Sequence, residues 1–356
     1  MTGMAHPGGP DHESPVLLHR DGHAAHVVLN RPRAINALTH EMVGIITAAL
    51  EEWATDDTVR TVVLTGAGER GLCAGGDIVA LWQDAKVGGT AAAAFWADEY
   101  RLNAMIEAYP KPYVAIMDGI VLGGGIGLSA HAGDRVVTER SAIGMPETGI
   151  GFLPDVGGTF LLSRAPGETG THLGLTAGSV GAGDAIAIGF ADHYVPSDRI
   201  PALLADLALR EAHVALAAAE QPAPDSPLAA ARSWLDDAYA GDDVLVILDR
   251  LRSLGTEEAT HAAATIEAKS PTSVRLTLRA LREAAQMTSL PLALDMEYRL
   301  ALGLHSHHDF VEGVRAQVVD KDRNPQWDPP RLDLVSDEDV ATYFVSLGER
   351  ELGLAR

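Results

Sequence analysis

The stretch Met145-Pro-Glu-Thr-Gly-Ile-Gly-Phe-Leu-Pro-Asp155-Val-Gly-Gly158 places two acids among apolar residues, glycine and proline. A carboxylate in apolar surroundings is costly unless it is paired or hydrogen-bonded, and neighbouring glycines let a backbone approach a ligand closely. We therefore predict that Glu147 and Asp155 belong to a site for proton transfer or acyl attack. Two glycine-rich segments upstream, residues 74–77 and 123–127, could supply backbone donors to the same site.

The composition is that of an aliphatic and acidic chain. Hydrophobic residues make up 47% of its 356 residues, enough for a sizeable core, and aromatic residues only 5%. The formal net charge of −22 argues against a nucleic-acid-binding surface, which needs a basic face. The acidity is expected to keep the protein soluble. With Cys73 as the single cysteine, no intrachain disulfide can form, which indicates a reducing compartment.

The N-terminal residues and the apolar runs bear on location. Residues 1–15 are rich in glycine, proline and histidine and lack the basic start and apolar run of a secretory signal, so we expect a disordered leader. No apolar run reaches the ~18 residues expected of a membrane span. We therefore predict a cytoplasmic protein without membrane or nucleic-acid partners.

Strand and helix patterns alternate up to about residue 195, which is typical of an α/β layer architecture. Beyond residue 200 only helical patterns occur, including one started by Ser270-Pro-Thr-Ser273. We predict an α/β core over residues 16–197 and a helical C-terminal region over residues 198–356. The expected strands lie at 16–20, 26–30, 61–65, 113–117 and 135–138, and the expected core helices begin at 39 and span 77–86, 91–108 and 124–131.

Three further features could indicate dinucleotide binding, a cysteine nucleophile or a metal site, but each is better explained as a structural element. Gly66-Ala-Gly-Glu-Arg-Gly71 matches a dinucleotide-binding pattern, yet the residues after it would break the required helix, so we predict a glycine-rich loop. Cys73 has apolar neighbours rather than the electropositive setting that a thiolate needs, and is expected to be a small buried residue. The cluster His305-Ser-His-His-Asp309 lacks ligand partners elsewhere and is expected to be solvated surface rather than a metal site.

Four motifs, in this order, resemble the crotonase (enoyl-CoA hydratase/isomerase) superfamily: Asn30-Arg-Pro-Arg-Ala-Ile-Asn-Ala-Leu38, Leu72-Cys-Ala-Gly-Gly-Asp-Ile78, Asp118-Gly-Ile-Val-Leu-Gly-Gly-Gly125 and Met145-Pro-Glu147. The resemblance implies a repeated β-β-α spiral, a helical C-terminal part and binding of acyl-CoA thioesters. It also implies an oxyanion hole made by the N–H groups of Gly76 and Gly124. Coenzyme A is part of the substrate, so no separate cofactor and no metal are expected. The residues that the resemblance places along coenzyme A are Ala34, Asn36, Ala37, Leu38, Ala74, Gly75 and Asp77.

At one position the sequence differs from the enoyl-CoA hydratases of the superfamily, and this difference bears on the reaction that the resemblance implies. Enoyl-CoA hydratases carry one glutamate three residues beyond the oxyanion glycine, where this chain has Gly127, and a second that matches Glu147. The missing glutamate counts against a hydratase. The presence of Asp155 instead resembles the 3-hydroxyisobutyryl-CoA hydrolase branch. Further agreement with that branch comes from Asp98-Glu-Tyr-Arg-Leu-Asn103, Lys111-Pro-Tyr-Val114, Phe310-Val-Glu-Gly-Val-Arg-Ala316 and Asp320-Lys-Asp-Arg-Asn-Pro-Gln-Trp327.

The resemblance implies hydrolysis of a 3-hydroxyacyl-CoA thioester, such as 3-hydroxyisobutyryl-CoA in valine degradation. Glu147 would attack the carbonyl or act as general base to a water, and Asp155 would orient the water or the substrate. Glu99 would accept a hydrogen bond from the substrate hydroxyl. An enoyl-CoA hydratase or isomerase and a non-catalytic acyl-CoA-binding protein are the alternatives, and the resemblance is compatible with a homo-oligomer.

Overall fold

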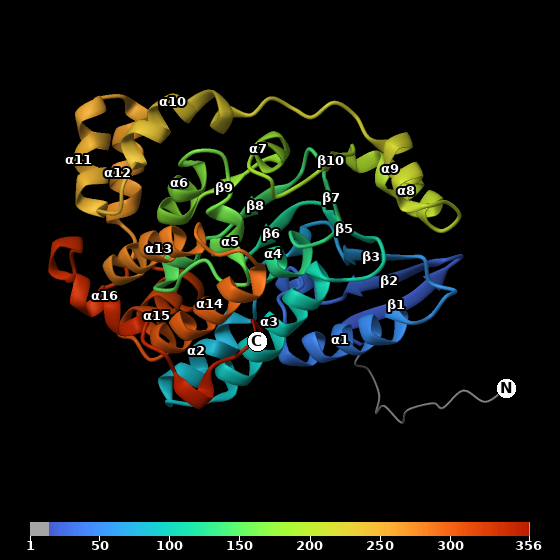
Figure 1. Cartoon of the computed structure of the whole chain (residues 1–356), viewed down its shortest axis with the longest axis horizontal. Coiled ribbons are helices and arrows are strands. Elements are labelled where there is room, and N and C mark those ends of the chain that lie inside the picture. The colour runs from blue at the N-terminus through green and yellow to red at the C-terminus, as the bar shows by residue number, and fades with distance from the viewer. Residues whose placement is uncertain (1–13, 356) are drawn as a thin grey trace.

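The computed structural model describes residues 14–355, which form two β-sheets surrounded by helices (Figure 1). The predicted leader lies outside the described residues except for its last two positions. The strands are β1 Val16–Asp21, β2 Ala24–Leu29, β3 Thr61–Gly66, β4 Gly71–Cys73, β5 Tyr113–Met117, β6 Ile120–Leu122, β7 Asp134–Val137, β8 Ala142–Gly144, β9 Ser179–Val180 and β10 His193–Tyr194. The α-helices are α1 His40–Ala54, α2 Ile78–Lys86, α3 Ala91–Glu107, α4 Gly124–Ser129, α5 Gly158–Leu162, α6 Thr169–Thr176, α7 Ala182–Ala187, α8 Ile200–Leu207, α9 Ala212–Ala219, α10 Pro227–Tyr239, α11 Val244–Leu254, α12 Glu257–Glu267, α13 Pro271–Ala284, α14 Leu290–His305, α15 His308–Val314 and α16 Asp337–Tyr343.

From β3 to β8, successive strands of the chain alternate between the two sheets. The larger sheet has the order β1-β2-β3-β5-β7-β10 and the smaller one the order β4-β6-β8-β9. β3, β5 and β7 therefore enter the first sheet, and the strand that follows each of them enters the second. Within each sheet these strands run parallel to one another, whereas β9 pairs with β8 in the antiparallel direction. The predicted α/β class and β-β-α spiral are thereby confirmed.

The turn between β5 and β6 shows how closely the two sheets approach each other. Gly119 has a φ of 79°, and a Cβ atom there would lie only 2.7 Å from Gly71 Cα. Glycine is therefore required by both conformation and space. Asp118 accepts hydrogen bonds from Thr138 Oγ1 at 2.6 Å and from Arg140 Nε at 2.9 Å, which ties this turn to the next turn of the spiral.

Helices cover both faces of the larger sheet. On one face α1 begins after the predicted N-cap, Thr39, whose Oγ1 accepts a hydrogen bond from Met42 N at 3.3 Å. Ile46 and Leu50 of α1 join the main apolar core with α3 and the sheet. On the other face α8 and α9 form a smaller apolar cluster with residues of β3, β5 and β7. α10, α11 and α12 pack in a third cluster with α13 (Figure 1).

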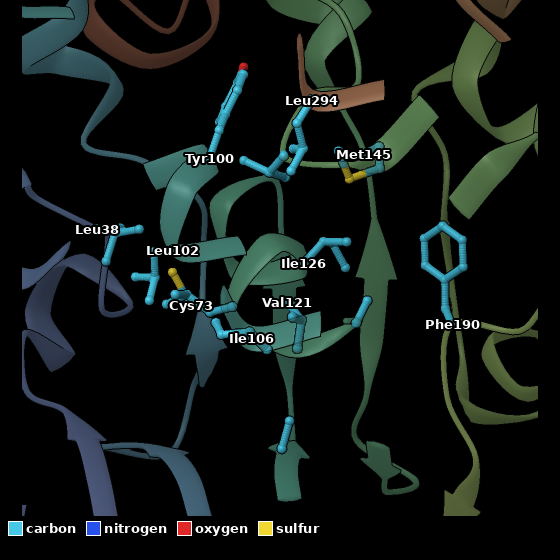
Figure 2. Packing of buried hydrophobic residues seen from close by; sticks show 14 of the residues in the cluster. Leu38, Cys73, Tyr100, Leu102, Ile106, Val121, Ile126, Met145, Phe190 and Leu294 are labelled. Carbon is cyan, nitrogen blue, oxygen red and sulfur yellow. The ribbon is translucent and has the colours of Figure 1, made fainter. Parts of the chain in front are cut away.

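Cys73 lies inside the main apolar core, as predicted. Figure 2 shows it in a cluster with Leu102, Ile106 and Val121. Burial raises the pKa of its thiol to about 12, so the thiolate is scarce at neutral pH. A nucleophilic role for this cysteine therefore has no physical support.

The expectation of a solvated loop at 305–309 is wrong. His305 ends α14 with 8% of its surface exposed, and Asp309 in α15 is fully buried. Asp309 accepts hydrogen bonds from Ser270 Oγ at 2.5 Å and from Asp328 N at 2.8 Å. The buried carboxyl group finds hydrogen-bond partners within the fold, which a sequence pattern alone could not show. Within residues 14–355 no group of three or more histidine, cysteine or acidic side chains is placed to hold a metal ion.

The loop before α1 is held by Asn36, a fully buried residue with a φ of 55°. Its Nδ2 donates to the carbonyl oxygens of Ala67, Gly71 and Leu72 at 3.1, 3.2 and 3.1 Å. Its Oδ1 accepts a hydrogen bond from Arg31 N at 2.9 Å. One amide thus joins this loop to the glycine-rich segment that leads into β4.

We predict that Asn36→Ala lowers the free energy of unfolding by about 2–4 kcal/mol. Three buried carbonyls lose a donor, and alanine tolerates the left-handed backbone less well than asparagine. Urea unfolding measures the difference. Asn30→Ala is the matched control, because that amide is exposed and, within residues 14–355, its one side-chain hydrogen bond goes to Ser14 O, at 3.0 Å. An equal loss in the two variants would contradict the role assigned to Asn36.

Candidate active site

A cavity of about 170 Å³ lies where the glycine-rich segments meet η2, the short 3-10 helix Glu147–Ile150. Its walls combine backbone, aromatic side chains and carboxyl groups. The predicted chemical residues all line it: Gly76, Glu99, Gly124, Glu147 and Asp155. The other lining residues are Ala74, Gly75, Ile78, Leu81, Phe95, Trp96, Leu122, Gly123, Pro146, Ile150, Phe152, Val156 and Val318.

Gly76 and Gly124 bring two backbone N–H groups to the same wall. A Cβ atom at Gly124 would lie 3.2 Å from Gly76 N. Neither N–H has a hydrogen-bond acceptor in the described part of the chain. For Gly124 this follows from its place at the start of α4, where the first N–H groups have no partner inside the helix. The pair is therefore free to donate two hydrogen bonds to one ligand oxygen.

Two carboxyl groups abut the glycine backbone. A Cβ atom at Gly123 would lie 2.7 Å from Glu147 Oε1, and one at Gly124 would lie 2.6 Å from Glu99 Oε1. Glu147 and Glu99 are only 6% and 2% exposed. Nevertheless, Glu147 Oε2 and Glu99 Oε1 have no hydrogen-bond partner among residues 14–355. Buried polar atoms are normally paired, so both oxygens are suited to a polar ligand.

Asp155 is held by a tyrosine for which we had predicted no role. Tyr100 lies next to Glu99 on α3, and its hydroxyl donates to Asp155 Oδ2 at 2.7 Å. Tyr100 is fully buried, and a buried tyrosine hydroxyl usually finds a partner. Helical spacing alone could not identify that partner, because the two residues are 55 positions apart.

Burial is the main reason why the pKa values of the carboxyl groups in this cavity are raised. It raises the pKa of Asp155 to about 7, against the opposing effect of the Tyr100 hydrogen bond. Burial and then the nearby Asp155 charge raise the pKa values of Glu147 and Glu99 well above their usual range. Like charges this close do not ionise independently. The cavity therefore holds both acidic protons and negative charge at neutral pH.

Gly127 has no room for a side chain. A Cβ atom there would lie 2.7 Å from both Asn103 Nδ2 and Val156 Cβ. A glutamate at this position, as in the hydratase pattern, would collide with α3 and with the residue that follows Asp155. The absence of a second glutamate is therefore built into the packing around α4.

The predicted coenzyme A residues fall into two groups. Ala74 and Gly75 line the cavity. Asn36 and Leu38 have buried side chains, and they shape the loop rather than offering side chains to a ligand. Leu38 pairs with the 74–77 segment, because its N–H donates to Gly75 O and its carbonyl accepts from Asp77 N, both at 2.8 Å. The remaining residues, Ala34, Ala37 and Asp77, are at least partly exposed beside this loop.

The backbone after Asp155 is strained. Val156 has a φ of 52°, which is a rare conformation for a β-branched residue and costs on the order of 1–3 kcal/mol. Glu297, on α14, lies next to this turn, is fully buried and was not predicted from the sequence. Burial raises the pKa of Glu297 to about 8. No motif in the sequence indicated that a residue so far along the chain would contact the turn after Asp155.

Comparisons of the sequence and of the fold with known proteins identify the family of this chain. The sequence model of the enoyl-CoA hydratase/isomerase family matches residues 24–344. The chain belongs to this family. It is 41% identical to the mitochondrial 3-hydroxyisobutyryl-CoA hydrolase of Danio rerio, over 96% of this chain and 92% of the relative. It is also 41% identical to the enzyme of the same name from Rattus norvegicus, over 95% and 90% of the two chains.

Two solved structures are also close to this family member. A carnitinyl-CoA dehydratase from Mycobacterium thermoresistibile is 49% identical with a TM-score of 0.93, covering 96% of this chain and 99% of that one. An enoyl-CoA hydratase from Rhodobacter sphaeroides is 41% identical with a TM-score of 0.90, covering 95% and 99%. The predicted superfamily and its hydrolase branch are confirmed by the family match and the curated relatives.

The predicted cellular location needs correction. The expectation of a cytoplasmic protein is contradicted by the curated relatives, which are named mitochondrial. A single reduced cysteine and a leader without a secretory signal were too weak a basis for that prediction. Between residues 14 and 355, no helix combines the length and apolar character that crossing a bilayer requires.

We predict that Tyr100→Phe raises the pKa of Asp155 above its value of about 7. A hydrogen bond donated to a carboxylate favours the ionised form, so its loss favours the proton. Carbon NMR titration of the aspartate carboxyl carbons measures the shift, with Asp155→Asn identifying the signal. Tyr109→Phe is the control, since that hydroxyl donates to Leu50 O away from the cavity. A lowered or unchanged Asp155 pKa in Tyr100→Phe would refute the contact.

Proposed function

We propose that this protein hydrolyses 3-hydroxyacyl-CoA thioesters, and that 3-hydroxyisobutyryl-CoA, an intermediate of valine degradation, is its substrate. The observation that carries the proposal is the single cavity in which two free N–H groups face a carboxyl pair. The names of the curated relatives support the same reaction. The cavity is small and suits a short acyl group, with the coenzyme A moiety along the loop that contains Asn36.

The N–H groups of Gly76 and Gly124 bind the thioester oxygen. Negative charge grows on this oxygen as the carbonyl carbon becomes tetrahedral. Donors already aimed at it stabilise that charge, and one such donor is worth about 3 kcal/mol in comparable sites. The crowding at Gly123 and Gly124 keeps these donors beside the carboxyl groups of Glu147 and Glu99.

Glu147 supplies the attacking group in one of two ways. As a nucleophile its carboxylate forms a C–O bond to the carbonyl carbon, the C–S bond breaks, and water then hydrolyses the anhydride. As a general base it takes a proton from water, whose oxygen attacks, and the departing thiolate takes a proton in turn. Both routes need Glu147 ionised. Because burial raises the pKa of Glu147, the ionised fraction grows as the pH rises, and Asp155 orients the water or the substrate.

Glu99 recognises the substrate hydroxyl. Its Oε1 lies beside the oxyanion donors and has no partner among the described residues. A substrate with a hydroxyl satisfies this buried oxygen, whereas a substrate without one leaves it unpaired. Sites built to hydrogen-bond a hydroxyl discriminate strongly against analogues that lack it.

Hydration or dehydration of an acyl-CoA is the second candidate function. Two solved structures at 49% and 41% identity are titled carnitinyl-CoA dehydratase and enoyl-CoA hydratase. Against this candidate, the packing of Asn103 and Val156 leaves no space for a second glutamate at position 127. The proposed hydrolysis needs only this chain, its thioester substrate and water, and a homo-oligomer is compatible with it.

Incubation with 3-hydroxyisobutyryl-CoA and with crotonyl-CoA separates the two candidates. We expect free thiol from the first substrate, measured with a chromogenic thiol reagent, and a stable enoyl absorbance with the second. Glu147→Gln should lower thiol release by about 10³-fold or more while coenzyme A binding changes little. Glu139→Gln is the control, because Glu139 is a surface acid bound to Ser197.

Loss of the enoyl signal without free thiol would favour the hydratase. No turnover of either substrate by the wild type would favour an acyl-CoA-binding protein. Near-normal thiol release by Glu147→Gln would remove Glu147 from the mechanism.

We predict that Glu99→Leu lowers kcat/KM for 3-hydroxyisobutyryl-CoA at least about tenfold more than for isobutyryl-CoA, because only the first substrate has a hydroxyl to bind. Glu99→Gln should be milder, since its amide oxygen can still accept a hydrogen bond. Asp98→Asn is the control, as that neighbouring carboxylate is exposed and binds Arg101 at 2.9 Å. Equal losses on both substrates would argue against recognition of the hydroxyl by Glu99.

A further inference from the structure

The turn that carries Asp155 has a backbone conformation that it would not keep in isolation. Val156 and Gly157 follow one another with φ values of 52° and 81°. A β-branched residue in the left-handed region persists only where its surroundings hold it there. The side chain of Asp155 immediately precedes this pair, so the same conformation decides where its carboxylate lies.

Close packing leaves this turn little freedom. A Cβ atom at Gly157 would lie 2.5 Å from His131 Nε2 and 2.6 Å from Leu290 Cδ1. His131 Nε2 lies 2.7 Å from Val156 O. Burial lowers the pKa of His131 to about 4, so the ring is neutral and carries its proton on Nε2, where it donates to that carbonyl.

Glu297 holds the other side of the turn. Its Oε2 accepts a hydrogen bond from Gly157 N at 2.6 Å, and its Oε1 accepts one from Thr159 N at 2.9 Å. Thr159 Oγ1 lies 2.5 Å from the same Oε1. The side chain is fully buried. Both oxygens of one carboxyl group are therefore committed to the backbone that follows Asp155.

We propose that Glu297 is a positioning residue, which holds the strained turn at Val156 and Gly157 so that Asp155 points into the cavity. The proposal rests on the proposed function only in that Asp155 takes part in hydrolysis. Glu297 does not line the cavity itself. It acts through the backbone of the turn, while Tyr100 fixes the carboxylate directly.

The ionised carboxylate is needed at this position because of its two acceptor oxygens, and the hydrogen bonds from Gly157 and Thr159 favour this form against the effect of burial. An amide has one oxygen and one NH2 group, and the NH2 group cannot accept a hydrogen bond. In Glu297→Gln, one backbone N–H, of Gly157 or of Thr159, would therefore face another donor. An unpaired buried N–H is unfavourable, so the turn is expected to relax and carry Asp155 with it.

This role gives α14 a direct part in the site. The helix belongs to the C-terminal region, yet it packs against both α3, which carries Glu99 and Tyr100, and α5, which follows Asp155. Tyr298, next to Glu297, stacks edge-on against Tyr100 with ring centroids 6.2 Å apart. One helix thus supports residues from two of the segments that form the cavity.

The test compares wild type with Glu297→Gln in the full chain. We expect kcat for 3-hydroxyisobutyryl-CoA to fall by about tenfold or more, because small misplacements of reacting groups are costly, with KM within about threefold. Carbon NMR titration should show the Asp155 pKa falling by on the order of one unit toward its ordinary value. A relaxed turn relieves burial, the larger effect on this pKa, and this outweighs the smaller, opposite effect of weakening the Tyr100 hydrogen bond.

Asp295→Asn is the matched control. This acid lies two residues before Glu297 on the same helix and accepts the N–H groups of Leu354 and Ala355 at 2.8 and 3.1 Å, so it supports the chain end and not the turn. It should leave kcat and the Asp155 titration at wild-type values. Equal effects of the two substitutions would reduce Glu297 to a general structural role and overturn the proposal.

An unchanged Asp155 pKa in folded Glu297→Gln would overturn it as well. If Glu297→Gln does not fold, Thr159→Val is the alternative, because it removes one of the three hydrogen-bond donors to Glu297 and preserves the side-chain volume. We expect a smaller decrease of the Asp155 pKa in this variant. An unchanged pKa there would count against the proposal. If the wild type releases no thiol, the proposed function fails, and the Asp155 titration alone still decides the role of Glu297.

Discussion

The site depends on the close approach of two backbone segments that only glycine permits. A Cβ atom at Gly124 would lie 2.6 Å from Glu99 Oε1, and one at Gly125 would lie 2.6 Å from Cys73 O. The segment after β4 therefore lies directly against the start of α4. Free N–H groups from two strand-to-helix connections meet there, and the carboxyl groups around them occupy space that side chains would otherwise fill.

That arrangement also explains why the pKa values of the acidic residues in and beside the cavity are raised. Glu99, Glu147, Asp155 and Glu297 are all at least nine-tenths buried. If all four carboxyl groups were ionised at once, their mutual repulsion would be prohibitive. Hydrogen bonds from Tyr100 and from the backbone at the start of α5 offset part of the cost for two of the acids. Glu147 Oε2 and Glu99 Oε1 have no such partner among residues 14–355, so these two carboxyl groups retain their protons more strongly and are the groups that a ligand can satisfy.

Much of this organisation could be predicted from the sequence. The strands near Val63 and Val114 and the helix capped by Thr39 follow from apolar periodicity and capping chemistry. The grouping of Gly76, Gly124, Glu147 and Asp155 followed from motifs that a known superfamily shares. Tyr100 and Glu297 could not be predicted, because their partners lie 55 and 140 positions away and only the tertiary fold brings them together. The burial of Asp309 was missed for the same reason.

The crowding around Gly127 limits what a single substitution at this position can achieve. Asn103 and Val156 already occupy the volume that a glutamate at that position would need. Converting this enzyme scaffold to the two-glutamate arrangement would thus require coordinated exchanges on α3, on α4 and in the turn after Asp155. Each exchange made alone would leave either a collision or a void. A glutamate introduced at position 127 alone is therefore expected to destabilise the folded protein rather than to complete a two-glutamate site.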